Sequence, residues 1–164
     1  SNKVCFAQSK PVLQSPKKSD REARLFVTFR PSDKISDENN KVCFAQSKPV
    51  LQSPKKDLRE ARLFISFRPY NKVSDEISTT SGYEYNKQNT ITAKSGKSKF
   101  KFDISQENFA WIASNKVEKK MIKAMKRGTR IMITGYNKSG SQTKDHYSLM
   151  GFTKAYNSAK KNCI

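Results

Sequence analysis

The nine residues ARLFISFRP, at positions 61–69, decide the fold class because their apolar side chains alternate along the chain. Leu63, Ile65 and Phe67 fall on one face of an extended strand, since successive side chains of a strand point to opposite sides. Pro69 then ends the strand, because proline has no N–H to give to a sheet. The stretch therefore predicts a β-strand with one apolar face.

The same strand occurs earlier, as ARLFVTFRP at 23–31, within a longer duplication. Residues 2–38 match residues 40–76 at a constant offset of 38, with only seven differing positions. Residues 2–18 are repeated without a change, so every difference follows them. Recent duplication, sequence conversion and deliberate assembly of the chain would each leave this pattern.

Each copy is typical of a β-hairpin, with a short strand KVCFAQ, a proline-broken loop SKPVLQSPKK and the alternating strand. A repeat solenoid needs about three units to bury a continuous face, and this chain has two. We therefore expect residues 1–39 to form an extra copy of the opening hairpin and residues 40–164 to form the main domain.

Further strands are expected after the second copy, where Thr, Ile and Tyr are frequent. Their segments are ISTTSGYEY (77–85), NTITAK (89–94), KFKFDIS (99–105), NFAWIA (108–113), TRIMITGY (129–136) and HYSLM (146–150), with a turn over NKSGSQTKD (137–145). The strict alternation of KFKFDIS places Phe100, Phe102 and Ile104 on one face. The only tryptophan, Trp111, is expected in the core.

Two helices are predicted, over 115–127 and about 152–162. Asn115 is a candidate N-cap with Glu118 three residues on, and Gly128 is a fitting stop for the first helix. The apolar stripes are Val117, Met121, Ala124 and Met125 in the first helix, and Phe152, Ala155, Tyr156, Ala159 and Cys163 in the second. Many short strands with two short helices predict a mainly β fold, either an antiparallel β-sandwich or a partly closed barrel.

The chain is strongly basic, with 33 Lys and Arg against 14 Asp and Glu and a net charge of +19. Such a charge attracts nucleic acid, anionic lipid or acidic glycans, but lysines spread over a solvated surface give the same total. The outward face of the first predicted helix is a candidate anion-binding surface, made of Lys119, Lys120, Lys123, Lys126 and Arg127.

The residues do not support a catalytic site. Asp145 and Ser148 lie near His146, the only histidine, but on a strand Asp145 would face away from the other two. Neither a GxSxG elbow nor a phosphate-binding glycine loop occurs, and the three cysteines lack the spacing of a zinc site. We therefore expect a non-enzymatic protein without catalytic residues, cofactor or metal.

The order of several motifs resembles the invasion-associated locus B family of bacterial exported proteins. These motifs are CFAQSKP, LFISFRP, SGYEY, AWIA, MIKAMKRG and YSLMGFTKAYNSAKKNC. The resemblance covers roughly residues 40–164 and implies a β-sandwich-like domain exported to the periplasm or cell envelope. The family's opening strand, usually with a tryptophan, is not visible before KVCF, which leaves open whether the first copy takes its place.

The resemblance also implies a disulfide between a cysteine of the opening strand and one of the closing helix. These correspond to Cys43 and Cys163, and Cys5 would then be unpaired or compete for Cys163. An oxidising compartment such as the periplasm allows the bond, whereas a cytosolic protein would keep all three as small buried thiols.

No apolar run approaches the roughly 20 residues of a transmembrane helix, and SNKVCFAQSK lacks the apolar region of a signal peptide. We expect neither in this chain. The favoured function is a periplasmic, envelope or secreted protein with a binding or structural role. Its partners would be acidic envelope components, glycans or a host-cell surface protein, and the duplicated strands allow a strand-exchanged homodimer.

The alternative function is a nucleic-acid-binding β-barrel, which is less favoured. Tyr83 and Tyr85 would share one strand face and stack on bases, beside a basic surface. Tyrosines spaced by two are also ordinary half-buried strand residues.

Overall fold

The computed structural model describes residues 6–9, 25–31, 41–56 and 58–163. The strands are β1 (Phe6–Ser9), β2 (Leu25–Pro31), β3 (Lys41–Ser47), β4 (Leu51–Ser53), β5 (Arg62–Arg68), β6 (Val73–Thr80), β7 (Ile91–Ser95), β8 (Ser98–Phe102), β9 (Ile104–Gln106), β10 (Phe109–Trp111), β11 (Arg130–Tyr136) and β12 (Gln142–Ser148). The helices are α1 (Asn115–Arg127) and α2 (Phe152–Cys163). Cys5 lies outside the described residues.

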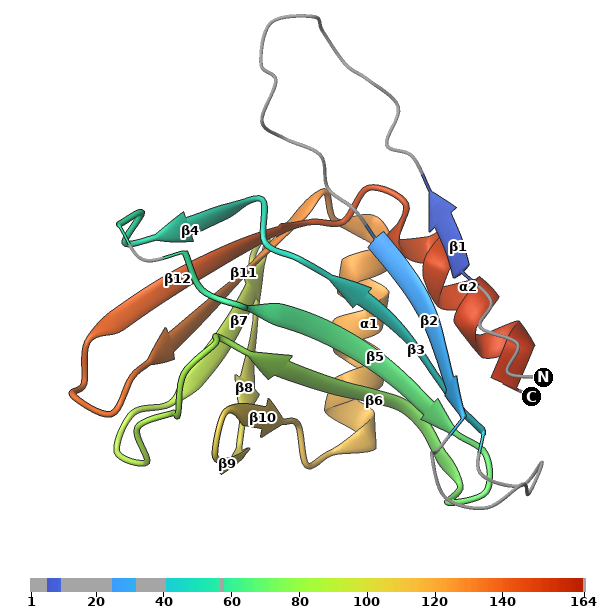
Figure 1. Cartoon of the computed structure of the whole chain (residues 1–164), viewed down its shortest axis with the longest axis horizontal. Coiled ribbons are helices and arrows are strands. Elements are labelled where there is room, and N and C mark those ends of the chain that lie inside the picture. The colour runs from blue at the N-terminus through green and yellow to red at the C-terminus, as the bar shows by residue number, and fades with distance from the viewer. Residues whose placement is uncertain (1–5, 10–24, 32–40, 57, 164) are drawn as a thin grey trace, which may run out of the picture.

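The strands form two antiparallel sheets arranged as a sandwich (Figure 1). The larger sheet has the order β1-β2-β3-β5-β6-β10-β9, and the smaller has the order β4-β12-β11-β7-β8. Neither sheet closes on itself among the described strands, so the structure takes the sandwich form of the two predicted. The mainly β fold with two helices is confirmed.

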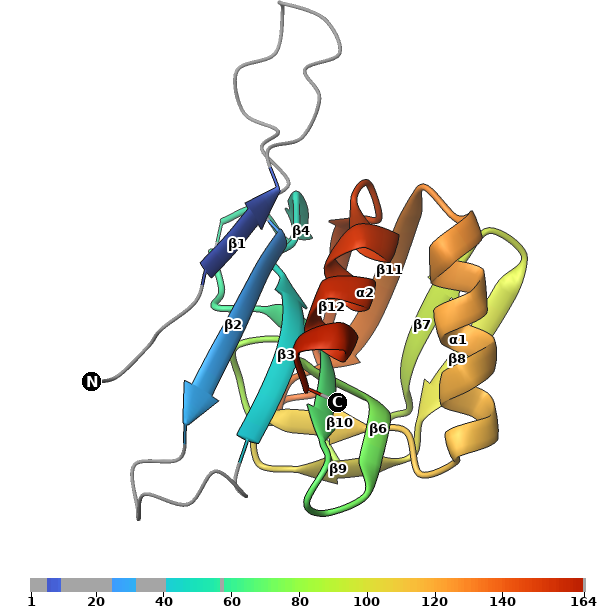
Figure 2. The ribbon, with the colours of Figure 1, turned by 90° about the vertical axis from the view of Figure 1, so that its right-hand side faces the viewer.

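Both helices lie on the side of the sandwich that faces the viewer in Figure 2. There α1 contacts β6 and β8, whereas α2 contacts β2, β3 and β5. Helix α1 therefore bridges the larger and smaller sheets, whereas α2 packs on strands of the larger sheet.

The core follows the alternation of β5. Leu63, Ile65 and Phe67 are each at most 3% exposed, and the Phe67 ring packs edge-on against Tyr156 of α2. Removing this apolar surface from water supplies the main driving force for closing the sandwich. The predicted apolar face of the strand is thus confirmed.

The helix bounds are confirmed, but the predicted capping box is wrong. Ser114, and not Asn115, is the N-cap of α1, and its side chain makes no capping hydrogen bond. Glu118 turns into the core instead, where its Oε1 accepts a hydrogen bond from the Ile77 N–H at 2.8 Å. The Glu118 carboxylate therefore accepts a hydrogen bond from a buried strand amide, and not from the N-terminus of α1 as predicted.

Two predicted segments have different bounds because glycines permit turns there. In ISTTSGYEY the strand ends at Thr80, and Gly82 follows with φ +79°, which ordinary residues rarely adopt. The turn predicted over 137–145 is shorter, because Gly140 has φ +81° and β12 already begins at Gln142.

KFKFDIS is divided between the two sheets, so its prediction as one strand is wrong. Phe102 is buried in β8, whereas Ile104 in β9 belongs to the larger sheet and is 47% exposed. The chain crosses from one sheet to the other at this point. The alternating apolar side chains on the two sides of the crossing therefore do not share one buried face.

Trp111 is not a core residue, contrary to the prediction. In β10 the inward position belongs to Ala110, which is fully buried, so Trp111 points to the other face of the sheet. There it is half-buried and stacks at a tilt on Phe109, with ring centroids 5.8 Å apart.

Candidate anion-binding groove

Helix α1 separates its apolar and basic residues onto two faces. Met121, Ile122 and Met125 are each at most 5% exposed, while the lysines between them point outward. This separation follows from the 3.6-residue period of the helix. The sequence therefore places several positive charges along the solvent side of α1.

The basic side of α1 faces the turn between β7 and β8, and a hollow of about 370 Å³ lies between them. The helix contributes Lys120, Lys123 and Arg127, and the turn contributes Ser95 and Ser98. Gly96, Ala124 and Gly128 complete the lining. We call this hollow the basic groove.

Two glycines shape the basic groove, Gly96 through its backbone conformation and Gly128 through the space that it leaves. Gly96 has φ +56° and allows a tight turn between β7 and β8. At Gly128 a Cβ would lie 2.7 Å from the Ser95 Oγ and 3.1 Å from the Ala124 carbonyl oxygen, too close for any other residue without a shift. The helix does end before Gly128, as predicted, but this glycine has φ −87° and is needed for space.

The candidate basic surface is only partly brought together. Lys120, Lys123 and Arg127 line the basic groove, whereas Lys119 is exposed outside its lining. The ammonium of Lys126 lies 4.0 Å from the centre of the Tyr156 ring, where a cation–π contact holds it against α2. Three of the five predicted residues therefore line one hollow.

Sequence reasoning missed Ser95 and Ser98. They precede α1 by about twenty residues and belong to a different element, so no local period connects them with the lysines. A serine pair around a glycine turn, SGKS at 95–98, was the available signal, but it is typical of any tight hairpin.

The chemistry of the basic groove suits an anion. Among the described residues no acidic side chain forms an ion pair with Lys120, Lys123 or Arg127. Lysine offers a compact charge and arginine a planar fork of donors, and both bind phosphate or carboxylate oxygens. Its lining contains no carboxylate or imidazole that would move a proton.

The two tyrosines of the nucleic-acid hypothesis do not form a stacking platform. They lie in the loop after β6 and not on one strand, and their rings pack edge to face with centroids 5.5 Å apart. Tyr85 is 3% exposed and donates a hydrogen bond to the Ser81 Oγ, and burial raises its pKa above the ordinary 10.0. Tyr83 is half-buried, with its hydroxyl 2.6 Å from the Thr143 Oγ1.

Asp145 belongs to a buried ion pair and not to a hydrolytic triad. Both oxygens of its carboxylate accept hydrogen bonds from Arg59, at 2.6 and 3.1 Å, and the Asp145 side chain is 0% exposed. His146 and Ser148 lie on the other face of β12, as the alternation predicts.

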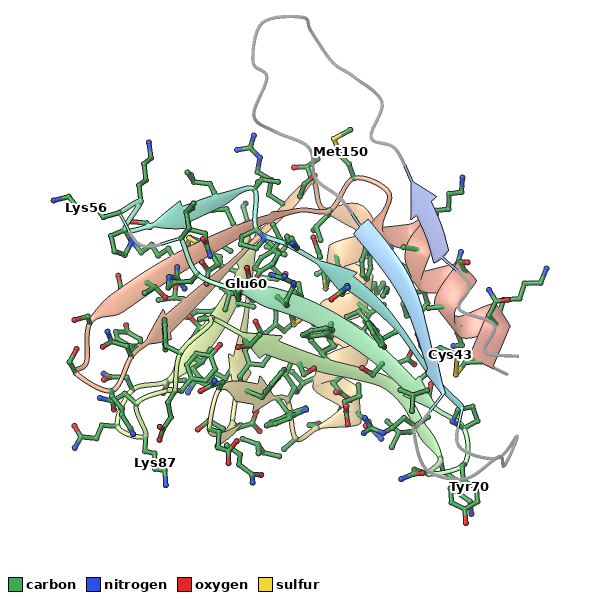
Figure 3. The ribbon with its side chains drawn as sticks, in the orientation of Figure 1. Cys43, Lys56, Glu60, Tyr70, Lys87 and Met150 are labelled. Carbon is green, nitrogen blue, oxygen red and sulfur yellow. A yellow bond between two sulfur atoms is a disulfide. The ribbon has the colours of Figure 1, made fainter. Side chains whose placement is uncertain are left out.

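The disulfide implied by the resemblance is present. Cys43 in β3 bonds to Cys163 at the end of α2, with Cα atoms 5.7 Å apart and a sequence separation of 120 residues. Figure 3 shows Cys43 at the end of β3 that lies beside the end of α2. The bond ties the closing helix to the larger sheet.

The comparison with known families decides the classification. Residues 31–160 match the family described as Invasion associated locus B (IalB) protein. The chain belongs to this family. The resemblance seen in the sequence is thereby confirmed, and IalB membership suggests a bacterial protein associated with the cell envelope.

No curated protein and no solved structure matches the chain. Within the part of this IalB protein that the structure describes, no helix has the length and apolar character needed to cross a bilayer.

Proposed function

We propose that this IalB protein acts outside the cytoplasm, in the periplasm or envelope or as a secreted protein, as a non-enzymatic binding protein. The basic groove holds an acidic envelope component, such as the phosphate groups of an envelope lipid or an acidic glycan. The observation that carries this proposal is the convergence of three cationic side chains on one hollow beside the Ser98 hydroxyl, since the Ser95 hydroxyl already donates to the Arg130 carbonyl oxygen at 3.1 Å. The net charge of +19 adds long-range attraction toward such a partner.

The disulfide supports a location outside the cytoplasm. Disulfides persist in oxidising compartments and are rare in the bacterial cytosol. Both cysteines are at most 3% exposed, so once formed the bond is shielded from thiols in solution.

Binding to vesicles tests the basic groove. The parent protein is expected to sediment with phosphatidylcholine vesicles that contain lipid A and not with phosphatidylcholine alone. The variant Lys120→Glu/Lys123→Glu is expected to bind about tenfold more weakly or worse, because each surface charge near an anionic membrane contributes about 1 kcal/mol.

A matched variant separates a site from general attraction. Lys154→Glu/Lys161→Glu carries the same net charge, but its substitutions lie on exposed positions of α2. Its affinity is expected to stay within about twofold of the parent, since screening limits the reach of a surface charge to roughly 8 Å at physiological salt. Equal losses in both variants would show that the groove is no binding site.

Fractionation of the native bacterium tests the location. Peptide mapping under non-reducing conditions is expected to find the Cys43–Cys163 bond in protein from the periplasmic or secreted fraction. Protein found in the cytosol with both cysteines alkylated would exclude this part of the proposal.

A further inference from the structure

Strand β3 has copies of one sequence on both of its edges. β2 and β5 are related by the offset of 38, and each pairs with β3 antiparallel. Ala45 lies opposite Val27 on one side and opposite Ile65 on the other, so the two copies take the same register. The outer edge of β3 therefore accepts this strand in one defined alignment.

The first two strands also form a complete unit. Ala7 in β1 lies opposite Val27 in β2, which is the register of Ala45 opposite Ile65 in the second copy. In the larger sheet this hairpin borders only β3, whereas β5 is held between β3 and β6. The β1–β2 hairpin is thus the unit that can leave without breaking any other strand pair.

We propose that the β1–β2 hairpin exchanges between two copies of this chain, each hairpin pairing with β3 of the other molecule. The exchanged hairpin makes the strand pairs that it makes within its own chain, so the dimer needs no new interface. Reciprocal exchange closes the assembly as a two-fold dimer.

A second copy is the occupant that the sequence favours. The outer edge of β3 matches Leu25–Pro31 along seven consecutive pairs, and every copy of the chain carries that strand. An uncovered β3 would expose a row of unpaired N–H and C=O groups, which is a template for another strand. Residues 32–40 separate β2 from β3 in the sequence and lie outside the described residues.

Cysteine cross-linking across the β2–β3 pair tests the exchange in the full-length chain. Phe26 lies opposite Gln46, so Phe26→Cys in one chain and Gln46→Cys in another are expected to join when the two are refolded together. Cys5→Ser is included in both to prevent competing bonds. A disulfide-linked heterodimer in non-reducing mass spectrometry, rising with protein concentration, is the expected result.

Two control pairs keep the result interpretable. Phe26→Cys with Phe44→Cys is two residues out of register on the same face and is expected to give little heterodimer, because diagonal partners are about 7–8 Å apart. The double variant Phe26→Cys/Gln46→Cys in a single chain is expected to form an internal bond at high dilution.

Two outcomes would overturn the proposal. An internal bond at high dilution, without any heterodimer at high concentration, would show that the hairpin stays on its own β3. The absence of the internal bond would show that β2 does not pair with β3 at all. Neither outcome bears on vesicle binding by the basic groove, so the two proposals fail separately.

Discussion

Arg59 and the cations of the basic groove carry the same charge in opposite surroundings. The Arg59 side chain is 10% exposed and its guanidinium donates to both oxygens of Asp145 and to the Ser81 carbonyl oxygen. Lys120 and Lys123 lie in solvent on α1 and face hydroxyl groups and a glycine turn. One charge is neutralised inside the fold, and the others are available to a partner.

Buried and exposed charges act on different properties of the protein. A buried ion pair is costly to break, because the remaining partner is left uncompensated in a medium of low dielectric constant. Surface charges contribute little to stability but set the field that a ligand meets. Substitutions near Arg59 should therefore change the free energy of unfolding, and substitutions in the basic groove should change binding.

The largest expected effect belongs to Asp145→Ala. Removing the carboxylate leaves Arg59 buried without its counter-ion and takes a hydrogen-bond acceptor from Gln52. The free energy of unfolding is expected to fall by about 3–5 kcal/mol in denaturant titrations. The control Glu84→Ala, which removes an exposed ion pair with Lys138, is expected to cost less than about 1 kcal/mol. Equal losses of unfolding free energy in the two variants would show that the buried ion pair contributes no more to stability than the exposed one.

A smaller effect is expected at the wall of the basic groove. Gly128→Ala places a methyl group against Ser95 and the Leu149 Cδ1 and is expected to destabilise the protein by about 1–3 kcal/mol. Ser95→Ala removes the closest atom, so the double variant is expected to recover part of the loss in a thermodynamic cycle. If the stability losses of the two single variants simply add in the double variant, the Ser95 hydroxyl is not what opposes a methyl group at position 128.

Glu118 tests a buried carboxylate that has no cationic partner among the described residues. Burial raises its pKa above the ordinary 4.5, although the hydrogen bond from Ile77 opposes the shift. The folded state therefore binds the proton more tightly than the unfolded chain, and the contribution of Glu118 to stability declines as pH rises from 4.5 through the raised pKa.

Glu118→Gln is expected to remove that decline. Gln keeps an oxygen for the Ile77 N–H, so the free energy of unfolding at pH 7 should stay within about 1 kcal/mol of the parent. Urea titrations between about pH 4 and 7 should give a shallower fall with rising pH than the parent shows. An unchanged slope would assign the pH dependence to other groups.

The smallest effect on stability is expected for Lys123→Glu. Its free energy of unfolding should stay within about 0.5 kcal/mol of the parent, as for most surface substitutions. Its binding to lipid A vesicles should nevertheless weaken, and the salt dependence of that binding should become shallower. A loss of stability without a change in binding would show that Lys123 acts on the fold and not on a ligand.

The sequence predicts best where one periodic pattern faces one core. Residues 115–127 alternate lysines with methionines at helical spacing, and the helix has these bounds. The strand 61–69 has its alternation and its proline, and β5 lies there with its inner residues buried. The pairing of Cys43 with Cys163 came from the family resemblance and is present.

The failures have a common physical cause, which is competition between distant segments. Glu118 was expected at the helix terminus, but Ile77 of β6, forty-one residues away, offers it a buried N–H. Trp111 was expected in the core, but its neighbour Ala110 faces the core, so Trp111 lies on the opposite face of the sheet. The serines of the basic groove were missed because their proximity to α1 exists only in the folded sandwich.

The Cys43–Cys163 bond makes residues 43–163 a covalent ring, since it joins β3 to the end of α2. Cleavage of one peptide bond in an exposed segment, such as residues 138–141, would open this ring without releasing a fragment. A nicked molecule would keep both halves attached and its sheets paired until a reductant cut the bond. Proteolysis therefore needs either two cuts or one cut and reduction to take residues 43–163 apart.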